Sequence, residues 1–565
     1  MSKSKVTVLN IEDRNSDSTI NIALDTLMIG KQCIIFVNTK RSAESVAEKI
    51  SNIIMKDKKN VYKSFIEEEK LNSISNDILK AISSPTKQCH KLSATSKYGV
   101  AFHHSGLVSA QRKIIEENFK DRIVKIIVAT PTLAMGVDLP AYRVIIRDLK
   151  RFGQWGMDYI PVLEYEQQAG RAGRPSYDTH GEAICIAEDN KEKLEIKEQY
   201  INGVPEPIIS KLAVEPIMRT YILSLISSGF ITNISELEQF FSETFYAKHY
   251  GDLTKLNDII NKMIDQLEEW KFLNVQRNEN NANDSGKNTN AKDDFVSALK
   301  LSFKKNTSKE KEEIKLSATL LGRRVSELYL DPYTAHNIIL SLETAVRKID
   351  EINTYSFVHM ICSCLELRPL LRVKVKEFDE YSVISQNKAE KLLIDIPELF
   401  DAEFEDFLNS IKTSELFNDW LEEKDEEYLM EKYDVRPGEL HSKRERADWL
   451  IFSSEELSRL LKMHVLVKDL SKLRFRLKYG AKEELIPLLQ LKNIGRVRAR
   501  KLFDNRIKDI SDVKNSDLTT LSQLIGKATA LDIKKQVGEE LSEDKVVVKT
   551  NKRKGQKNLE DYGED

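Results

Sequence analysis

Short runs of apolar, β-branched residues alternate with helical stretches between residues 20 and 187, and this alternation constrains the fold more than any other feature of the sequence. The apolar runs lie at 33–37, 123–128, 144–146 and 183–187, and a clear helical stretch lies at 42–53. Strands buried on both faces read as continuous apolar runs, and helical crossovers connect parallel strands. The pattern therefore predicts an α/β lobe built on a parallel sheet that is covered on both faces.

After about residue 205 the short apolar runs give way to longer segments with a 3.6-residue period, which predict a mainly helical remainder. Such segments lie at 216–229, 335–349, 355–367 and 447–461. A polar stretch at 277–294 interrupts a small α/β module and predicts a disordered insertion. Residues 541–565 are rich in lysine and predict a flexible basic tail. A length of 565 residues suits about four domains.

Charge and cysteine content exclude several classes of protein. Lys plus Arg number 87 and Asp plus Glu number 89, so the net charge of 87 − 89 = −2 supplies no general attraction to nucleic acid or membrane. The five cysteines are scattered, without zinc-ligand spacing, which predicts a reduced cytoplasmic protein with no structural metal. The N-terminus lacks a signal-type apolar run and no stretch is long and apolar enough to span a bilayer, so we expect neither export nor membrane insertion.

The strongest motif is Gln167-Gln-Ala-Gly-Arg171-Ala-Gly-Arg174-Pro175. Two arginines three residues apart share one helical face, and guanidinium groups bind phosphate oxygens bidentately without losing their charge. The pair therefore predicts a polyphosphate site. The alternative is a pair of ordinary surface arginines on a solvated helix.

Three further motifs accompany these arginines. A loop that runs from Thr130 to Pro140 follows a buried strand and includes Gly136 and Asp138. Asn38 and Thr39 follow the first strand in the same way, and the segment 102–107 contains His104. Loops at the carboxyl ends of strands in open α/β sheets are common ligand sites, so these motifs predict one shared functional edge.

Together these motifs resemble motifs IV, IVa, V and VI in the second RecA-like lobe of a superfamily 2 helicase. The resemblance is closest to the Ski-like branch, and within it to the archaeal repair helicases related to human helicase-Q-like and to the helicase part of DNA polymerase theta. Segments 215–219, 224–230 and 244–247 resemble that family's winged helix, and 321–332 resembles the beginning of its helical ratchet domain. The expected domains are a second RecA-like lobe at 1–203, a winged helix at 204–315, a ratchet bundle at 316–475 and a helix-hairpin-helix module at 476–540.

The resemblance implies roles for several residues. Arg171 and Arg174, with Gln167, would complete an ATP site, and Gly136 and Asp138 would lie beside the nucleotide. The DNA contacts expected from the lobe motifs are Asn38, Thr39, His104 and Thr130.

A complete family member also has a first RecA lobe with a Walker A loop and a DExH box, and neither occurs in this sequence. Gly526-Lys527-Ala528 lacks the earlier glycine and the hydroxyl residue of a phosphate-binding loop. ATP and Mg²⁺ would therefore bind only with a first lobe supplied from elsewhere, for instance as a separate chain. We expect this chain to be inactive as an ATPase by itself.

Residues 147–161 form two strand-like flanks around a glycine-rich tip, which predicts a β-hairpin. In the family a hairpin at this place splits duplex DNA, and Phe152, Trp155 and Tyr159 would stack on the terminal base pair. Ordinary packing of these aromatic rings against the lobe is the alternative.

Trp449 lies in an amphipathic helix that resembles the family's ratchet helix, in which a tryptophan engages single-stranded bases. The family's arginine two turns earlier is Ser442 in this sequence, so Lys443 or Arg446 would have to supply the charge. A tryptophan in the protein core is the alternative.

Residues 491–502 resemble a helix-hairpin-helix, in which a glycine turn presents backbone N–H groups to a DNA phosphate. Arg496, Arg498, Arg500 and Lys501 flank that turn, and a plain αα-hairpin is the alternative. In the tail, Gln556, Leu559 and Tyr562 have the spacing of a sliding-clamp-binding peptide, although the usual second aromatic residue is Gly563 here. A solvated tail without a partner is the other possibility.

The sequence thus predicts the C-terminal part of an ATP-dependent 3′-to-5′ DNA helicase that acts at replication forks and in DNA repair, in the cytoplasm at the nucleoid. One alternative is a DNA-binding scaffold without catalytic function. The other is an RNA helicase of the same branch, against which the helix-hairpin-helix and the clamp-like peptide argue.

Overall fold

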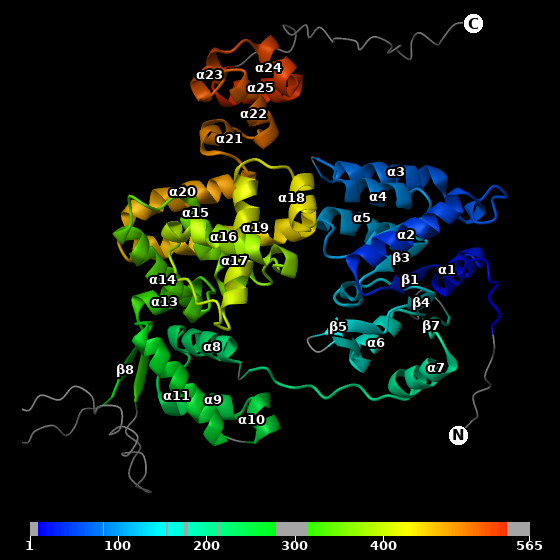
Figure 1. The fold of residues 1–565 in the computed structure, drawn as a ribbon, viewed down its shortest axis with the longest axis horizontal. Coiled ribbons are helices and arrows are strands. Elements are labelled where there is room, and N and C mark those ends of the chain that lie inside the picture. Colours follow the sequence, from blue (N-terminus) through cyan, green and yellow to red (C-terminus); the bar gives the residue numbers. More distant parts are fainter. Residues whose placement is uncertain are drawn as a thin grey trace, which may run out of the picture. The chain divides into compact units, whose positions relative to one another are not determined.

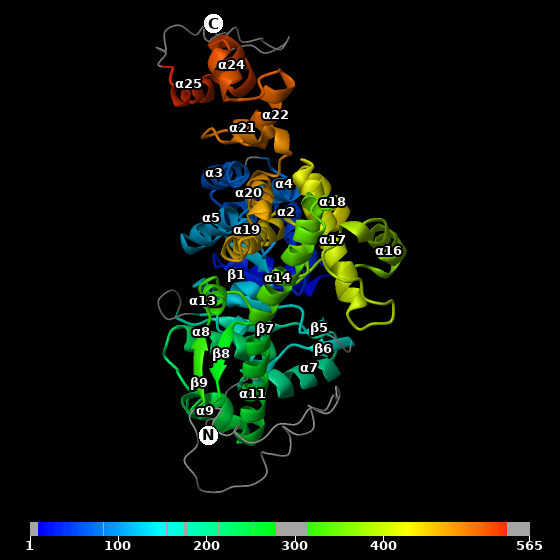
Figure 2. The same cartoon turned by 90° about the vertical axis from the view of Figure 1, so that its left-hand side faces the viewer.

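The computed structural model describes residues 9–82, 84–153, 156–173, 179–212, 214–251, 253–277 and 314–539. The chain forms two compact units (Figures 1 and 2). One comprises Met1–Ile208 with Lys424–Glu445, and the other comprises Ile209–Glu423 with Arg446–Asp565.

The first unit contains a five-stranded sheet with the order β2-β3-β1-β4-β7, in which all neighbouring strands are parallel. The strands are β1 (Cys33–Phe36), β2 (Val100–His103), β3 (Ile126–Ala129), β4 (Arg143–Ile146) and β7 (Glu182–Cys185). All four residues of β1, β2, β3 and β4 are buried. Since successive side chains point to opposite faces, both faces of the sheet are covered, and the predicted parallel α/β lobe is confirmed.

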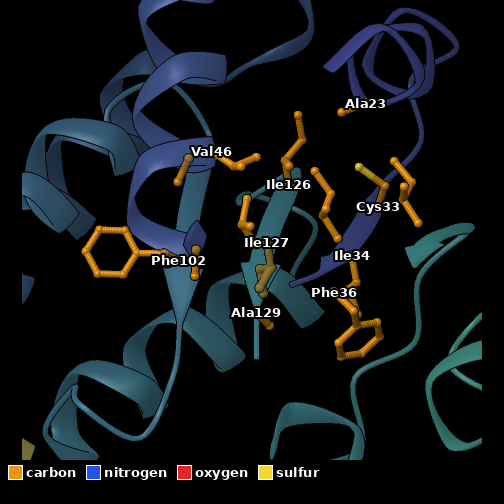
Figure 3. Close-up of a cluster of buried hydrophobic side chains, with 14 of the residues drawn as sticks. Ala23, Cys33, Ile34, Phe36, Val46, Phe102, Ile126, Ile127 and Ala129 are labelled. Atoms are coloured by element: carbon orange, nitrogen blue, oxygen red, sulfur yellow. The ribbon is translucent and has the colours of Figure 1, made fainter. Parts of the chain in front are cut away.

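Helices α1 (Ser18–Met28) and α2 (Lys40–Met55) pack on the sheet, with α1 against β1 and β4, and α2 against β2 and β3. Figure 3 shows the resulting core, to which α1 contributes Ala23 and α2 contributes Val46. Ile34, Ile127 and Phe102 lie there with no exposed surface. Each such side chain contributes about 1.5–3 kcal/mol through burial, so this core fixes the positions of the strand ends.

Further elements complete the lobe. They are α3 (Glu68–Lys80), α4 (Lys87–Ser96), α5 (Ser109–Lys120), α6 (Val162–Ala169), α7 (Asn190–Ile196), and an antiparallel hairpin of β5 (Lys150–Gly153) and β6 (Gly156–Tyr159).

Arg143 is a buried charge at the start of β4. It forms ion pairs with Asp25 at 2.8 Å and Glu182 at 2.7 Å, and it donates to the hydroxyl of Thr26 at 2.8 Å. A buried guanidinium is tolerated only when its donors are satisfied in this way. These pairs connect α1 to two neighbouring strands.

The second unit begins with a small α/β module. Its elements are α8 (Glu215–Ser227), α9 (Ile234–Ser242), α10 (Phe245–Tyr250), α11 (Leu253–Glu269), the antiparallel pair β8 (Leu273–Gln276) and β9 (Lys315–Ala318), and α13 (Leu320–Glu327).

A helical bundle and a C-terminal helical module follow, so the prediction of a mainly helical remainder is confirmed. The bundle contains α14 (Pro332–Arg347), α15 (Thr354–Cys362), α16 (Phe378–Asn387), α17 (Phe404–Leu421) and α20 (His464–Tyr479). Helix α19 (Pro437–Leu460) begins within the first unit's residues and continues into those of the second. The C-terminal module contains α21 (Ile486–Leu489), α22 (Arg496–Asp504), α23 (Ile510–Asn515), α24 (Leu518–Ile525) and α25 (Lys527–Gln536) around its own apolar core.

The helix expected at 355–367 is shorter in the structure, because α15 ends at Cys362. A separate 3₁₀ turn covers Leu365–Leu367, and Pro369 follows. Proline disfavours the helical conformation of the residue before it, so an apolar period alone overestimates this helix. No helix among the described residues is both long and apolar enough to cross a bilayer.

Candidate nucleotide- and DNA-binding surfaces

The loop that carries Gly136 and the loop that carries Arg171 are joined by direct hydrogen bonds. Ala141 N donates to Arg171 O at 3.0 Å, and Gly173 N donates to Ala141 O at 2.9 Å. The Arg171 guanidinium donates to the carbonyl oxygens of Ala134 and Val137. The two motifs therefore form one rigid edge of the lobe.

Arg171 is 8 % exposed, and burial lowers its pKa from the ordinary value. A guanidinium still keeps its proton at neutral pH. Arg171 donates to two neutral carbonyl oxygens, and no carboxylate among the described residues pairs with it. This is the electrostatic setting that favours a phosphate group nearby.

Gly136 and Asp138 are exposed on the same loop. Gly136 has a φ of +79°, and an added Cβ there would meet nothing within 4 Å. Only the left-handed backbone therefore requires glycine at this position, and the space above it is open to a ligand. Gln167 is partly buried, and its Oε1 has no hydrogen-bond partner among the described residues. Arg174 lies outside the described residues.

The motif after β1 is tied to the β5–β6 hairpin. Asn38 donates from its backbone to Asp148 Oδ2 at 3.0 Å and from its side chain to the carbonyl of Lys150. Thr39 is exposed, and its hydroxyl accepts from Ser42 N at 3.0 Å as the N-cap of α2. Thr130 is 8 % exposed, with its hydroxyl 3.0 Å from that of Thr132. Of these three predicted DNA contacts, only Thr39 has an exposed side chain.

The predicted hairpin is confirmed, since Lys150 pairs with Tyr159 and Gly153 with Gly156. Tyr159 is half-buried, and its hydroxyl donates to Glu195 at 3.1 Å while Lys150 Nζ lies 4.6 Å from its ring centroid. Tyr159 therefore packs at the base of the hairpin. Trp155 and the side chain of Phe152 lie outside the described part of the structure.

His104, an expected DNA contact, lies in the interior of the lobe. Its side chain is fully buried, with the ring stacked on Phe102 at a centroid separation of 5.4 Å. His104 Nδ1 accepts from Gly106 N at 3.1 Å, and Nε2 faces Glu44 at 3.5 Å. The position of His104 at a strand end favours a ligand contact. In the structure, however, the imidazole points into the lobe, where it faces the carboxylate of Glu44.

Trp449 lies in the middle of α19 and is half-buried. Its indole N–H donates to the carbonyl oxygen of Leu328 at 3.0 Å. One edge of the ring is therefore fixed by the fold, while part of the ring is exposed. Arg446, the expected substitute for the missing arginine, donates to the carbonyl of Arg368.

The helix-hairpin-helix arginines differ sharply from one another. Arg500 forms ion pairs with Glu423 at 2.6 Å, Glu484 at 2.7 Å and Asp504 at 3.6 Å, so its charge is already compensated. Arg496 lies 4.4 Å from the centroid of the Trp420 ring. The four cations of the motif therefore differ in their surroundings, and their binding to phosphates stays a prediction.

Arg498 and Lys501 are the exposed members of that set. Arg498 donates to the carbonyl of Asn493 at 2.9 Å, and within the described residues no carboxylate partner is recorded for either side chain. Gly495 caps α22, and an added Cβ there would meet nothing within 4 Å. This hairpin presents an accessible helix N-terminus beside two cations.

Sequence reasoning missed a second hairpin in the same module. Helix α24 ends at Ile525, Gly526 has a φ of +90°, and α25 begins at Lys527. The signal was present in Gly526-Lys527, which the sequence analysis considered only as a phosphate-binding loop of the Walker type. The tail residues Gln556, Leu559 and Tyr562 lie outside the described residues.

Three family models match the chain. They are the helicase conserved C-terminal domain over 68–176, domain 4 of the archaeal helicase over 355–480, and the SAM-like helix-hairpin-helix tandem over 485–539. The first lies on the lobe that carries Arg171, the second includes Trp449, and the third covers both hairpins.

Curated relatives match over nearly the whole chain. The ATP-dependent DNA helicase Hel308 of Methanococcus vannielii is 37% identical over 92% of this chain and 67% of its own length. The proteins of the same name from Methanocella arvoryzae and Pyrococcus horikoshii are 35% and 33% identical, each over 94% of this chain and over 66% and 67% of their own lengths. The chain thus spans about two thirds of the length of these relatives.

Proposed function

Because this chain belongs to the Hel308 family of ATP-dependent DNA helicases, we propose that it acts as the C-terminal part of a 3′-to-5′ DNA helicase at replication forks and in DNA repair. The observation that carries the proposal is the joined edge formed by the two loops that contain Gly136 and Arg171. Within the described residues the Arg171 guanidinium of this edge has no carboxylate partner, and Gly136 of the same edge is exposed, which suits a nucleotide phosphate.

In this proposal Arg171 and Arg174 stabilise the negative charge that develops on the transferred phosphoryl group, with Gln167 beside them. Gly136 and Asp138 lie next to the nucleotide. The sequence contains no Walker A loop and no DExH box, which hold phosphate and Mg²⁺ in a complete helicase. ATP hydrolysis would therefore need a first RecA lobe as partner, and this chain contributes the opposite side of the nucleotide site.

The β5–β6 hairpin is proposed to separate the two DNA strands. Asn38 ties its first strand to the end of β1, and Arg151 forms an ion pair with Glu164 of α6 at 2.8 Å. These contacts hold the base of the hairpin on the lobe. Phe152 and Trp155 would stack on the terminal base pair, each stacked base being worth about 1–3 kcal/mol.

DNA is the proposed partner of the second unit. Trp449 would stack on single-stranded bases, and the two hairpins of the C-terminal module would contact phosphates. A contact between Gln556, Leu559 and Tyr562 and a sliding clamp is a further proposal, for which the support is residue spacing alone.

The proposed division of the ATPase site is tested by measuring DNA-stimulated ATP hydrolysis. The chain alone should show no appreciable turnover, and a purified first lobe from a family member should restore it. In the reconstituted enzyme, Arg171→Ala or Arg174→Ala should lower kcat more than DNA affinity, because these residues act on transition-state charge. Arg41→Ala is a matched control, since it removes an exposed arginine of the same lobe that lies outside both the nucleotide edge and the hairpin.

Robust Mg²⁺-dependent turnover by the pure chain, abolished by Arg174→Ala, would refute this proposal. A second candidate is a DNA-binding scaffold without ATPase function. The two are separated by the reconstitution, because a scaffold would bind DNA and stay inactive with the first lobe present. Competition between matched DNA and RNA forks distinguishes an RNA helicase.

A further inference from the structure

Residues Lys424–Glu445 belong to the first unit although they follow the lobe by more than two hundred positions in the sequence. This docking segment comprises α18 (Glu426–Tyr433), a short turn, and the first residues of α19 (Figure 1). Its contacts with the lobe have no part in the function proposed above. They involve the buried His104.

The loop His104–Leu107 of the lobe caps the N-terminus of α19. Gly438, the second residue of that helix, donates its backbone N–H to the carbonyl oxygen of Gly106 at 3.0 Å. An added Cβ on Gly438 would lie 2.4 Å from Leu107 O and 2.6 Å from Ser105 O. The first N–H groups of a helix have no partner within it, so a carbonyl from the lobe fixes where α19 begins.

A network of three side chains, the buried His104 and the largely buried Glu44 and Arg436, supports this cap. Arg436, directly before α19, donates from Nε to Glu44 Oε1 at 3.1 Å. His104 Nε2 lies 3.5 Å from the same oxygen, while His104 Nδ1 accepts from Gly106 N at 3.1 Å. The Nδ1 contact places the imidazole proton on Nε2, where it faces the carboxylate. His104 is therefore oriented by the capping loop and Arg436 by α19, with Glu44 between them.

The charge states of His104, Glu44 and Arg436 do not change near neutral pH. Burial by itself would raise the pKa of Glu44, but the contacts with His104 and Arg436 hold that pKa below its ordinary value. Burial lowers the pKa of His104, which therefore stays neutral. The result is a largely buried carboxylate paired with a largely buried guanidinium, each 12% exposed.

Exposed ion pairs surround the network of His104, Glu44 and Arg436. Arg41 contacts Asp434 in a bidentate pair at 2.8 and 2.9 Å, and its side chain is 73% exposed. Lys87 lies 3.0 Å from Glu427 of α18. Exposed pairs contribute little because water screens them, whereas breaking a buried pair leaves an uncompensated charge. We therefore expect the network of His104, Glu44 and Arg436 to stabilise the docking segment on the lobe, and the exposed Arg41 provides a control for it.

We propose that His104, Glu44 and Arg436 are positioning residues that anchor the start of α19 to the lobe and thereby order this helix for DNA binding by Trp449. The inference rests on the proposed DNA-binding role of α19. If the anchor is lost, α19 has to be ordered during binding, and that ordering costs conformational free energy. By reciprocity, DNA bound to α19 should stabilise the docking segment by the same factor.

The test uses the full 565-residue chain. Hydrogen exchange of the amides in 426–445 is measured with and without a single-stranded oligonucleotide, together with the dissociation constant for that oligonucleotide. The variants are Arg436→Ala, the isosteric Glu44→Gln, the conservative Arg436→Lys and the control Arg41→Ala. Arg436→Ala and Glu44→Gln should accelerate exchange in 426–445 by about tenfold or more, and leave exchange in β1 and β3 unchanged.

The same two variants should weaken single-strand binding several-fold, and Arg436→Lys should restore most of the affinity. Arg41→Ala should change neither quantity. In the wild-type chain DNA should slow exchange in 426–445, and Trp449→Ala should remove that effect. A purely local structural role would accelerate exchange without changing DNA affinity, and this result would overturn the inference. If Arg436→Ala fails to fold, Glu44→Gln provides the same comparison.

Failure of the proposed DNA-binding function can be distinguished from failure of the positioning role. If the proposed function is wrong, the wild-type chain will not bind single-stranded DNA at all, whatever the exchange rates of the docking segment. Normal binding by the wild-type chain, with equal affinity in Arg436→Ala and Glu44→Gln, would refute the positioning role alone.

Discussion

Arg498 and Lys501 should account for the salt dependence with which the C-terminal module binds DNA. A cation that contacts a phosphate releases a counterion, and each such contact contributes about 0.9 to the slope of log K against log salt on duplex DNA. The motif alone suggests four contacts, and hence a slope contribution of about 3.6. The structure removes two of them, because Arg500 is paired with three carboxylates and Arg496 lies on the Trp420 ring.

Two remaining contacts give a contribution of about 1.8 to the slope. When salt is raised from 50 to 200 mM, both proteins should bind DNA more weakly. The factor by which affinity falls should be about 12 times smaller for the double variant Arg498→Ala/Lys501→Ala than for the wild-type chain. Its affinity at low salt should be lower, because two phosphate contacts are missing. The matched control is Arg496→Ala/Arg500→Ala, which removes the same number of charges from the same helix and should leave the slope nearly unchanged.

Fluorescence anisotropy with a labelled fork duplex, titrated at five or six salt concentrations, measures these slopes. Circular dichroism should accompany it, because Arg500→Ala exposes Glu423 and Glu484 to each other without a cation. A fall of about 1.8 in the control pair would refute the argument from ion pairing. An unchanged slope in Arg498→Ala/Lys501→Ala would show that the hairpin is a plain αα-hairpin without a role in DNA binding.

Three further predictions concern the second unit. Trp449→Ala should weaken binding of single-stranded DNA by roughly 5-fold to 100-fold in anisotropy titrations without changing the salt slope, because stacking releases no counterion, whereas Trp449→Phe should keep most of the affinity. Burial lowers the pKa of His359 to about 3, so between that pH and about 6.5 the unfolded chain binds a proton that the folded chain does not, and stability falls as the pH drops below about 6.5. Urea unfolding at pH 5 should therefore show about 2 kcal/mol less stability than at pH 7. His359→Gln should remove this difference. Arg219→Ala should destabilise the second unit by about 3–5 kcal/mol in urea unfolding, since it leaves Asp331 buried without its partner, and the added change Asp331→Asn should recover part of that loss.

The sheet of the lobe could be predicted because its strands are buried on both faces and therefore read as continuous apolar runs. Strand β2 was not recognised, since its four residues end in His103 and the following residues read as a motif. The charge at the start of β4 was also unexpected. Arg143 is tolerated there only because Asp25 and Glu182 come from elements that the local pattern does not connect.

The positions of the candidate sites could be predicted from the sequence better than the partners of their side chains. Motif spacing located the loops of Gly136 and Arg171 and the β5–β6 hairpin. Whether a cation is available, however, depends on carboxylates far away in the sequence, as Glu423 shows for Arg500. The inward turn of His104 has the same cause, because Glu44 and Arg436 meet only in the folded chain.

The close approach of Gly106 and Gly438 has a consequence for how such a protein can diversify. An added Cβ on Gly106 would lie 2.4 Å from Arg436 Cδ, and one on Gly438 would lie 2.4 Å from a backbone oxygen that cannot move aside easily. The two positions therefore cannot change independently, although they are encoded far apart. We expect recombination between family members to exchange the lobe loop and the start of α19 together, and chimeras that inherit only one of them to lose the close contact.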